Sequence, residues 1–302
     1  MKYRIYLSAW VSSLRLKTLP LAISAILVGN VLAYWQKQFD WLIMLLCITT
    51  AALLQILANL ANDYGDTIKG VDKPDRIGPK RGIQHHLITI KQLSIALMIN
   101  VILVVILGLI LLVIANLNRS VFWLFIMLGL LSIIAAITYT MGNKPYGYNG
   151  LGDISVLLFF GIISVIGSYY LQTKILSLSI IFPAIACGFL SVAVLNINNL
   201  RDRQSDRMNN KKTLIVFIGD KWGRYYHIIL LIVAMLLFNY FNYNYLSNPW
   251  NSLCLFIIPF FYLICCRVLK AKRAYEFAAL FLPMIKLSLI TNLLFCVGVL
   301  LS

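Results

Sequence analysis

Nine long apolar runs dominate the sequence, and short polar segments separate them. A helix that crosses a bilayer needs about 20 mostly apolar residues, which is the length of these runs. The pattern therefore predicts nine transmembrane helices, near residues 19–36, 41–61, 93–115, 121–141, 154–171, 175–199, 226–246, 252–269 and 278–301. We expect an all-α polytopic membrane protein with a single transmembrane domain over residues 1–302.

Composition supports the same class of protein. Of the 302 residues, 61% are hydrophobic and 12% are charged, against about 45–50% and about 25% in soluble domains. This balance excludes a cytosolic enzyme, a secreted disulfide scaffold and a nucleic-acid-binding domain. The six cysteines fall in apolar runs without metal-ligand spacing, so we interpret them as packing residues.

The basic residues follow the predicted topology. Lys and Arg are concentrated in the N-terminal tail and after the second, sixth and eighth runs, whereas the segment between the seventh and eighth runs has none. Cytoplasmic segments of membrane proteins are enriched in Lys and Arg. The pattern predicts a cytoplasmic N-terminus and a C-terminus on the opposite side of the cell (inner) membrane. The net charge of +16 is then mostly a topology signal.

The acidic residues are few and clustered. Six of the ten carboxylates fall in residues 63–75 and 202–206, at the cytoplasmic ends of the second and sixth runs. Residues three and four apart share a helix face, so each window predicts one polar row. The rows consist of Asn59, Asp63 and Asp66, and of Asn198, Asp202 and Asp206. Ionisable groups at this depth are costly and mark functional sites.

The two rows predict a metal-bound phosphate site that faces the cytoplasm. Facing rows of oxygen ligands repel each other unless cations lie between them. Mg²⁺ prefers carboxylate oxygens completed by substrate phosphates, and Lys and Arg follow both rows. We therefore expect a diphosphate held through bridging Mg²⁺. The predicted metal ligands are Asn59, Asn62, Asp63, Asp66, Asn198, Asp202 and Asp206.

A weak internal duplication agrees with this arrangement. The rows lie four runs apart, and each has an Asn four residues before its first Asp. Two four-helix units plus a last helix would place the rows on opposite sides of a central cavity.

The segment over residues 144–153 is rich in Gly and Tyr and has two interpretations. It is either a cap over the site, with Lys144 near the diphosphate and the tyrosines near an aromatic substrate, or an ordinary turn with interfacial aromatic residues. Asp153 could equally cap the fifth helix. His85 and His86 have no third ligand nearby, and His227 is interpreted as an interfacial residue.

At the acidic rows the sequence resembles the UbiA superfamily of intramembrane prenyltransferases. That superfamily carries Asn-Asp-x-x-Asp-x-x-x-Asp on its second helix and Asp-x-x-x-Asp on its sixth. The first motif reads Asn62-Asp63-Tyr-Gly-Asp66-Thr-Ile-Lys-Gly70 here, so Gly70 replaces the third acid and Asp72 is the candidate substitute. The second motif, Asp202 to Asp206, matches fully.

Other segments extend the resemblance over essentially the whole chain. Lys212-Thr213 stands where the superfamily has a basic residue before Ser or Thr, and residues 15–20 resemble its entry to helix 1. Residues 59–81, 138–153 and 195–206 are most similar to the branch that prenylates 1,4-dihydroxy-2-naphthoate in menaquinone synthesis.

The resemblance implies an enzyme that transfers a polyprenyl group from polyprenyl diphosphate to 1,4-dihydroxy-2-naphthoate, with Mg²⁺ as cofactor. The acceptor would lose CO₂ and give a demethylmenaquinol, while the bilayer would hold the donor's tail. The implied catalytic residues are Asp63, Asp66, Asp202, Asp206 and Lys212. The implied substrate-binding residues are Arg15, Lys69, Asp72, Lys73, Arg76, Arg81, Tyr139, Lys144, Tyr146, Asp153, Asn199 and Lys212. No protein or nucleic-acid partner is indicated.

Two alternatives remain open at this point. Within the same fold, the acceptor could be another molecule, such as 4-hydroxybenzoate or haem. From a different class, a cation-coupled transporter would also carry intramembrane acids and duplicated halves. The acids at the cytoplasmic ends of the helices, rather than near the bilayer midplane, favour the enzyme.

Overall fold

The computed structural model describes residues 2–70, 82–83, 87–246 and 248–302, and its regular elements are helices. The long helices are α2 (Leu19–Trp35), α3 (Trp41–Ile68), α4 (Ile90–Ile114), α5 (Arg119–Thr138), α8 (Ile181–Met208), α9 (Leu214–Tyr245) and α11 (Ala274–Leu300). The shorter α-helices are α1 (Lys2–Leu14), α6 (Gly152–Leu157), α7 (Ser164–Thr173) and α10 (Ile258–Lys270). The short 3-10 and π segments are η1 (Leu16–Thr18), η2 (Tyr146–Tyr148), η3 (Leu158–Ile163), η4 (Leu178–Ile180) and η5 (Pro249–Ile257).

The described residues contain nine helical spans long and apolar enough to cross a membrane. This confirms the number of spans and the all-helical class predicted from the sequence. Four of the nine are composite. The first combines α1, η1 and α2, the fifth α6, η3 and α7, the sixth η4 and α8, and the eighth η5 and α10.

Three helices extend well beyond their apolar runs at the polar end of the molecule. The sequence predicted spans that stop at residues 61 and 199, but α3 continues to Ile68 and α8 to Met208. Helix α9 begins at Leu214, long before the predicted residue 226. Hydropathy marks only the part of a helix that lies in hydrocarbon, whereas tertiary contacts stabilise polar turns beyond it. All residues of the two acidic rows are therefore helical, the first row in α3 and the second in α8.

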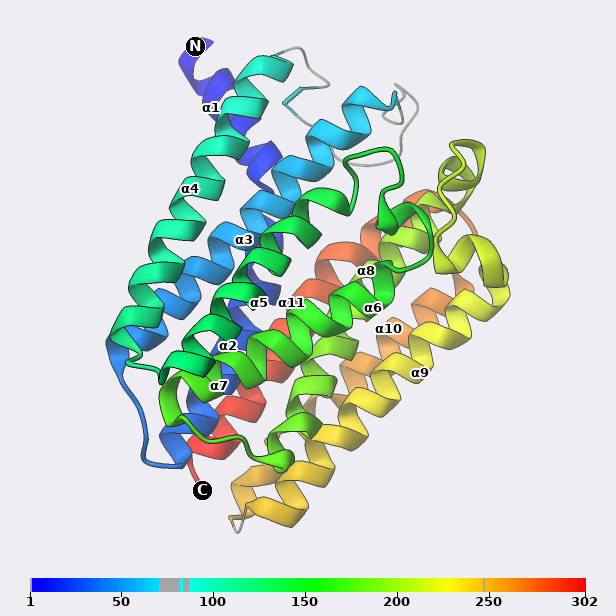
Figure 1. Cartoon of the computed structure of the whole chain (residues 1–302). Helices are drawn as coiled ribbons and strands as arrows, with labels where there is room; N and C mark the ends of the chain where they lie inside the picture. Colours follow the sequence, from blue (N-terminus) through cyan, green and yellow to red (C-terminus); the bar gives the residue numbers. More distant parts are fainter. Residues whose placement is uncertain (1, 71–81, 84–86, 247) are drawn as a thin grey trace.

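Helices α2, α8 and α11 pack together at the centre of the bundle. Helix α3 packs against α2, α4 and α5 on one side, and α9 packs against α8 and α10 on the other (Figure 1). Buried apolar residues form one large cluster on the α8–α11 side and another on the α3–α5 side. The cavity described below is lined from both.

A π-helical segment breaks the regular geometry of the fifth span. η3 follows α6 directly, and Ser164 Oγ donates to the carbonyl of Phe159 at 2.6 Å. Helix α8 packs closely against η3 at Gly161. A Cβ added to Gly161 would lie only 2.6 Å from the carbonyl oxygen of Ala184, so a larger residue would not fit here. The extra residue of a π segment rotates the side chains that follow it, and Phe159, Phe160 and Ile163 line the cavity.

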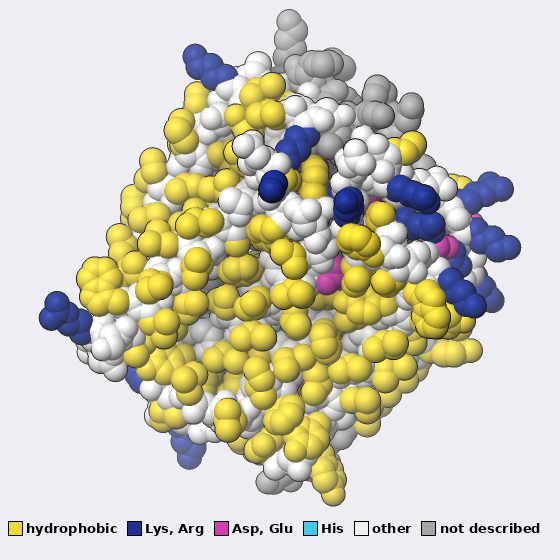
Figure 2. All heavy atoms as spheres, turned by 45° about the vertical axis from the view of Figure 1, so that its right-hand side comes forward, with side chains coloured by type: hydrophobic (Ala, Val, Ile, Leu, Met, Phe, Trp, Pro, Cys, Tyr) yellow, Lys and Arg dark blue, Asp and Glu magenta, His cyan; other side chains and the backbone are white. Residues whose placement is uncertain are grey.

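The two ends of the bundle differ in charge. The N-terminus lies at the same end as the α5–α6 and α8–α9 connections, and the C-terminus lies at the opposite end (Figure 1). Figure 2 shows Lys, Arg and acidic side chains gathered at the first of these ends, above a broad apolar surface. An apolar surface of this kind fits a lipid environment.

Candidate active site

A cavity of about 1030 Å³ runs down the middle of the bundle. On α3 its lining extends from Cys47 to Asp66, which is about 28 Å at 1.5 Å per residue. That length is close to the roughly 30 Å thickness of the hydrocarbon core. Most of the charged and amide side chains of the lining gather at one end, and these are Arg15, Lys17, Asn59, Asn62, Asp66, Asn198, Asn199, Arg201, Asp202 and Lys211; the amide of Gln55 lies deeper.

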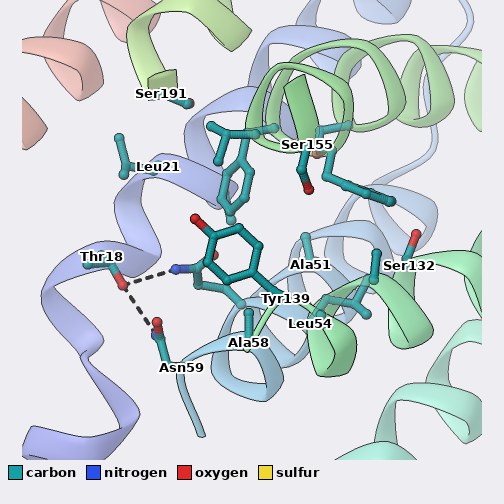
Figure 3. Close-up of a pocket in the computed structure, with 18 of the residues that line it drawn as sticks. Thr18, Leu21, Ala51, Leu54, Ala58, Asn59, Ser132, Tyr139, Ser155 and Ser191 are labelled. Atoms are coloured by element: carbon teal, nitrogen blue, oxygen red, sulfur yellow. Dashed lines mark hydrogen bonds between the residues drawn. The ribbon is translucent and has the colours of Figure 1, made fainter. Parts of the chain in front are cut away.

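The rest of the lining is mainly apolar. Leu54, Leu109, Phe125 and Phe159 are among the side chains that face this space. Figure 3 shows the intermediate region, where Tyr139 projects between Asn59 on one side and Ser155 on the other. The cavity is therefore amphipathic: it can hold an anionic group at one end and a long apolar group along its length.

On α3, Asp63 is fully buried and pairs with Arg15, whose Nη2 donates to Asp63 Oδ1 at 2.6 Å. Arg15 has φ 49° and ψ 49°, a left-handed conformation that separates α1 from η1. Asn59 secures this break, because its Nδ2 donates to Leu14 O at 3.0 Å and to Thr18 Oγ1 at 3.3 Å. An ion pair compensates the cost of a carboxylate at this depth.

On α8, the acids of the second row also have basic partners. Arg201 donates to both oxygens of Asp202, at 2.7 Å and 2.5 Å, in a bidentate pair. Lys211 Nζ lies 3.7 Å from Asp206 Oδ1. Asp63 and Asp206 are buried beside the lining, whereas Asp66 and Asp202 are part of it.

Tyr148, in η2, connects the two rows. Its hydroxyl donates to Asp66 Oδ1 at 2.7 Å, and its carbonyl oxygen accepts from the backbone N–H of Lys212 at 2.9 Å. Lys69 Nζ and Lys211 Nζ lie 4.6 Å and 5.2 Å from the centre of its ring. Cations over an aromatic face are held electrostatically, so this one side chain gathers charges from both halves of the molecule.

Glycines allow the polar end to pack this closely. A Cβ on Gly65 would lie 2.8 Å from the carbonyl oxygen of Thr140, and one on Gly147 would lie 2.6 Å from that of Tyr139. Tyr146 stacks edge-on against Tyr139 with 5.3 Å between the ring centres. The Tyr146 hydroxyl also donates to Ala135 O at 2.9 Å.

Tyr139 and Lys69, which lie outside the membrane-spanning segments, have shifted pKa values. Burial raises the pKa of the Tyr139 hydroxyl, and the negative charges of Asp153, Asp206 and Asp66 raise it further. Tyr139 therefore stays protonated and can donate a hydrogen bond. Desolvation lowers the pKa of Lys69, although the nearby Asp66 opposes that shift.

The donor set fits a hard divalent cation completed by a ligand. Among the described residues, the buried amide oxygens of Asn62 and Asn198 have no hydrogen-bond partner. Both side chains line the cavity, one on α3 and one on α8. Among the residues that the structure describes, no three His, Cys, Asp or Glu side chains lie close enough together to hold a metal without other ligands. Mg²⁺ needs only one or two carboxylates where phosphates supply the other ligands, so the residues fit Mg²⁺ bound together with a phosphate group.

The structure brings most of the predicted site residues together. Asn59, Asn62, Asp63, Asp66, Arg15, Tyr139 and Tyr146 gather on the α3 side, and Asn198, Asn199, Asp202 and Asp206 on the α8 side. Asp153 lies in the first turn of α6 and accepts from the Tyr226 hydroxyl at 3.3 Å, so it does not cap the helix with its side chain.

Lys144 and Lys212 are exposed and are not part of the cavity lining. Their roles remain predictions, as does that of Lys69, which lies near Tyr148. Asp72, Lys73, Arg76 and Arg81 lie outside the described residues, as do His85 and His86. His227 is fully buried in α9, so its interpretation as an interfacial residue was wrong. Its position at the start of an apolar run did not reveal that α9 begins thirteen residues before it.

Sequence reasoning did not single out three residues of this end: Tyr148, Arg201 and Lys211. Tyr148 belongs to the Gly- and Tyr-rich segment for which a cap over the site was one of two interpretations, and its neighbour Tyr146 was selected instead. Arg201 and Lys211 flank the second acidic row, where charge alone does not distinguish them from other loop bases.

Comparisons with known proteins find one family and several close relatives. Residues 22–290 match the UbiA prenyltransferase family. The chain is 51% identical to a 1,4-dihydroxy-2-naphthoate octaprenyltransferase of Escherichia coli (strain K12), over 97% of this chain and 96% of that protein. It is 46% identical to the 1,4-dihydroxy-2-naphthoate octaprenyltransferase of Haemophilus influenzae, over 98% and 97% of the two chains.

Solved structures share the fold at low sequence identity. An apo UbiA homolog from Aeropyrum pernix K1 matches with a TM-score of 0.68 at 14% identity, over 94% of this chain and 97% of that one. A UbiA homolog from Archaeoglobus fulgidus bound to DMAPP and Mg²⁺ matches with a TM-score of 0.65 at 13% identity, over 97% and 100% of the two chains.

We expect Asp63→Ala and Asp202→Ala to weaken divalent-cation binding by about tenfold or more, since losing even an indirect metal contact commonly has that effect. The measurement is free Mn²⁺ by electron paramagnetic resonance, with purified protein and inorganic diphosphate. Asp40→Ala is the control, because Asp40 caps α3 at the other end of the molecule. Unchanged Mn²⁺ affinity in both site variants would contradict the metal assignment.

Proposed function

Because the chain belongs to the UbiA prenyltransferase family, we propose that it transfers a polyprenyl group from polyprenyl diphosphate to 1,4-dihydroxy-2-naphthoate. The acceptor would lose its carboxylate as CO₂, and the product would be a demethylmenaquinol. The protein is a prenyltransferase with close relatives in menaquinone synthesis. The observation that carries the finer proposal is an amphipathic cavity with two acidic rows at its polar end.

The polar end is suited to the donor's diphosphate. Asp66 and Asp202 supply carboxylates from α3 and α8, and the unpartnered oxygens of Asn62 and Asn198 lie beside them. Bound among these oxygens, Mg²⁺ would neutralise diphosphate and stabilise the charge that it gains on leaving. The A. fulgidus homolog with DMAPP and Mg²⁺ supports this use of the fold.

The basic residues of the polar end supply further charge for the leaving group. Arg15, Arg201 and Lys211 line the cavity and lie at the acids whose charge they offset. Arg presents a planar fork that suits phosphate oxygens, whereas Lys acts as a point charge. Preorganised cations of this kind stabilise a transition state in which negative charge develops on the diphosphate.

The proposed reaction balances without another reactant. The bond from the donor's first carbon to the diphosphate oxygen breaks, and that carbon forms a new bond to the acceptor ring. The bond from the ring to its carboxylate breaks, CO₂ leaves and its bonding electrons return to the ring. Diphosphate is the other product. No net proton is consumed, and no covalent enzyme intermediate is required.

The remaining lining is suited to the donor's hydrocarbon chain. Most of the lining below the polar end is apolar, and it follows α3 for most of a bilayer's thickness. Gly108 and Gly129 lie in this lining, and a Cβ on either would meet no atom within 4 Å. The open space beside them would accommodate a long isoprenoid.

For orientation, we propose that the N-terminus and the polar end face the cytoplasm and that the C-terminus lies on the other side. The support is the concentration of Lys and Arg at the polar end. In inverted membrane vesicles, a membrane-impermeant maleimide should label Asn149→Cys and not Gln38→Cys. Intact cells should give the reverse result. The native cysteines among the described residues are buried or half-buried, which limits background labelling. Labelling of both positions from one side would contradict the orientation.

With 1,4-dihydroxy-2-naphthoate, polyprenyl diphosphate and Mg²⁺, the purified protein should release one CO₂ per prenyl group transferred. Chelation of Mg²⁺ should abolish turnover, and 4-hydroxybenzoate should be a poor acceptor. The measurement combines ¹⁴CO₂ release from carboxyl-labelled acceptor with chromatography of the prenylated product. Equal prenylation of 4-hydroxybenzoate would refute the acceptor assignment, and full activity in excess chelator would refute the role of the metal.

Gly129→Phe should shorten the longest donor that the enzyme uses, because the new ring would fill space beside the lining. We expect kcat/KM to fall on the order of tenfold with octaprenyl diphosphate, with little change for geranyl diphosphate. Met127→Phe is the matched control, since Met127 is 60% exposed on the outer surface of the same helix. An equal loss of kcat/KM with both donors would show that the prenyl chain of the donor does not extend past Gly129.

A further inference from the structure

Gln55 is a buried polar residue in the apolar part of the cavity, and neither acidic row includes it. It lies on α3, eight residues before Asp63 and thus about 12 Å deeper in the bundle. The side chain lines the cavity and is 9% exposed. A polar amide among hydrocarbon is costly unless its donors and acceptor are satisfied.

The contacts of Thr18 fix the orientation of this amide. The Thr18 hydroxyl donates to the carbonyl of Arg15 at 2.9 Å, so toward Gln55 it acts as an acceptor. Gln55 Nε2 donates to Thr18 Oγ1 at 3.1 Å, and Asn59 Nδ2 donates to the same oxygen at 3.3 Å. Figure 3 shows the two bonds that converge on Thr18, opposite Tyr139. A hydroxyl has one proton and two lone pairs, so this one is fully used.

With its nitrogen turned to Thr18, Gln55 directs its oxygen away from that contact. Gln55 Oε1 is buried and has no hydrogen-bond partner among the described residues. Thr50, five residues deeper on α3, also lines the cavity, and its buried hydroxyl lacks a partner there too. A buried acceptor without a donor costs about 1–3 kcal/mol. The structure therefore leaves Gln55 Oε1 without the donor that a buried acceptor requires.

We infer that Gln55 Oε1 accepts a hydrogen bond from a ring hydroxyl of the aromatic acceptor, and that this contact orients the acceptor for prenylation. The inference rests on the proposed function. An isoprenoid tail has no hydrogen-bond donor, so it cannot satisfy Gln55. A hydroxylated aromatic ring can do so while its carbon framework packs against Leu54 and Ala58, which line the same region. The polar end, above Gln55, would hold the diphosphate.

The test compares two inhibitors that each lack one hydroxyl, namely 1-hydroxy-2-naphthoate and 4-hydroxy-2-naphthoate. Their inhibition constants against 1,4-dihydroxy-2-naphthoate would be measured for the wild-type enzyme and for Gln55→Met, which has a similar length but no acceptor oxygen. We expect Gln55→Met to weaken one inhibitor about tenfold, the usual effect of one hydrogen bond, and to leave the other within about twofold. Gln55→Glu, as a neutral acid, keeps one donor and one acceptor. Its inhibition constants for both inhibitors should therefore return to those of the wild-type enzyme.

Leu54→Met is the control for a change of shape in the same lining, and it should affect both inhibitors alike. Equal weakening of both inhibitors by Gln55→Met, or no weakening of either, would overturn the inference while the prenylation assay still supported the proposed function. If Gln55→Met does not fold, Gln55→Leu takes its place, because it also lacks an acceptor oxygen, and equal weakening of both inhibitors, or no weakening of either, again refutes the contact. A wild-type enzyme that prenylates no naphthoate would instead refute the proposed function.

Discussion

Carboxylates buried at the end of a hydrocarbon-embedded helix are costly, and the polar end of this protein is organised around offsetting that cost. Asp63 is completely buried and pairs with Arg15, which approaches only because the chain adopts a left-handed conformation there. That conformation separates α1 from η1, and Asn59 and Thr18 stabilise the break. This ion pair, the hydrogen bonds of Asn59 and apolar packing together hold the N-terminal segment on α3.

The same requirement explains how nearby basic residues and Tyr148 gather at the second row. Arg201 and Lys211 offset the charges of Asp202 and Asp206, and Tyr148 joins this group to Asp66. A network of this kind holds the acids of α3 and α8 around a common space. The charges that stabilise the protein on its own are also those that a diphosphate would meet, so binding exchanges one set of partners for another.

Below the polar end, the structure separates two substrate requirements along one cavity. The apolar lining suits a hydrocarbon chain that already partitions into the membrane, whereas the amide of Gln55 requires a hydrogen-bond donor. Its orientation follows from the hydroxyl of Thr18, and Thr18 belongs to the same break that positions Arg15. The diphosphate end and the proposed acceptor contact are therefore linked through the few residues that precede α2.

The sequence by itself determined the nine spans, because hydrocarbon thickness requires long apolar runs, and it determined the two acidic rows, because helical spacing places those residues on one face. The tertiary structure decided which partners those rows meet. Asp63 and Arg15 are separated by 48 residues, and Asp66 and Tyr148 by 82, so no local pattern specifies either contact. The tertiary structure also placed Lys211 rather than Lys212 in the lining of the cavity, since neighbouring residues of a turn point in different directions. Hydropathy could not reveal these features, because it records where a chain avoids water and not which buried atoms find partners.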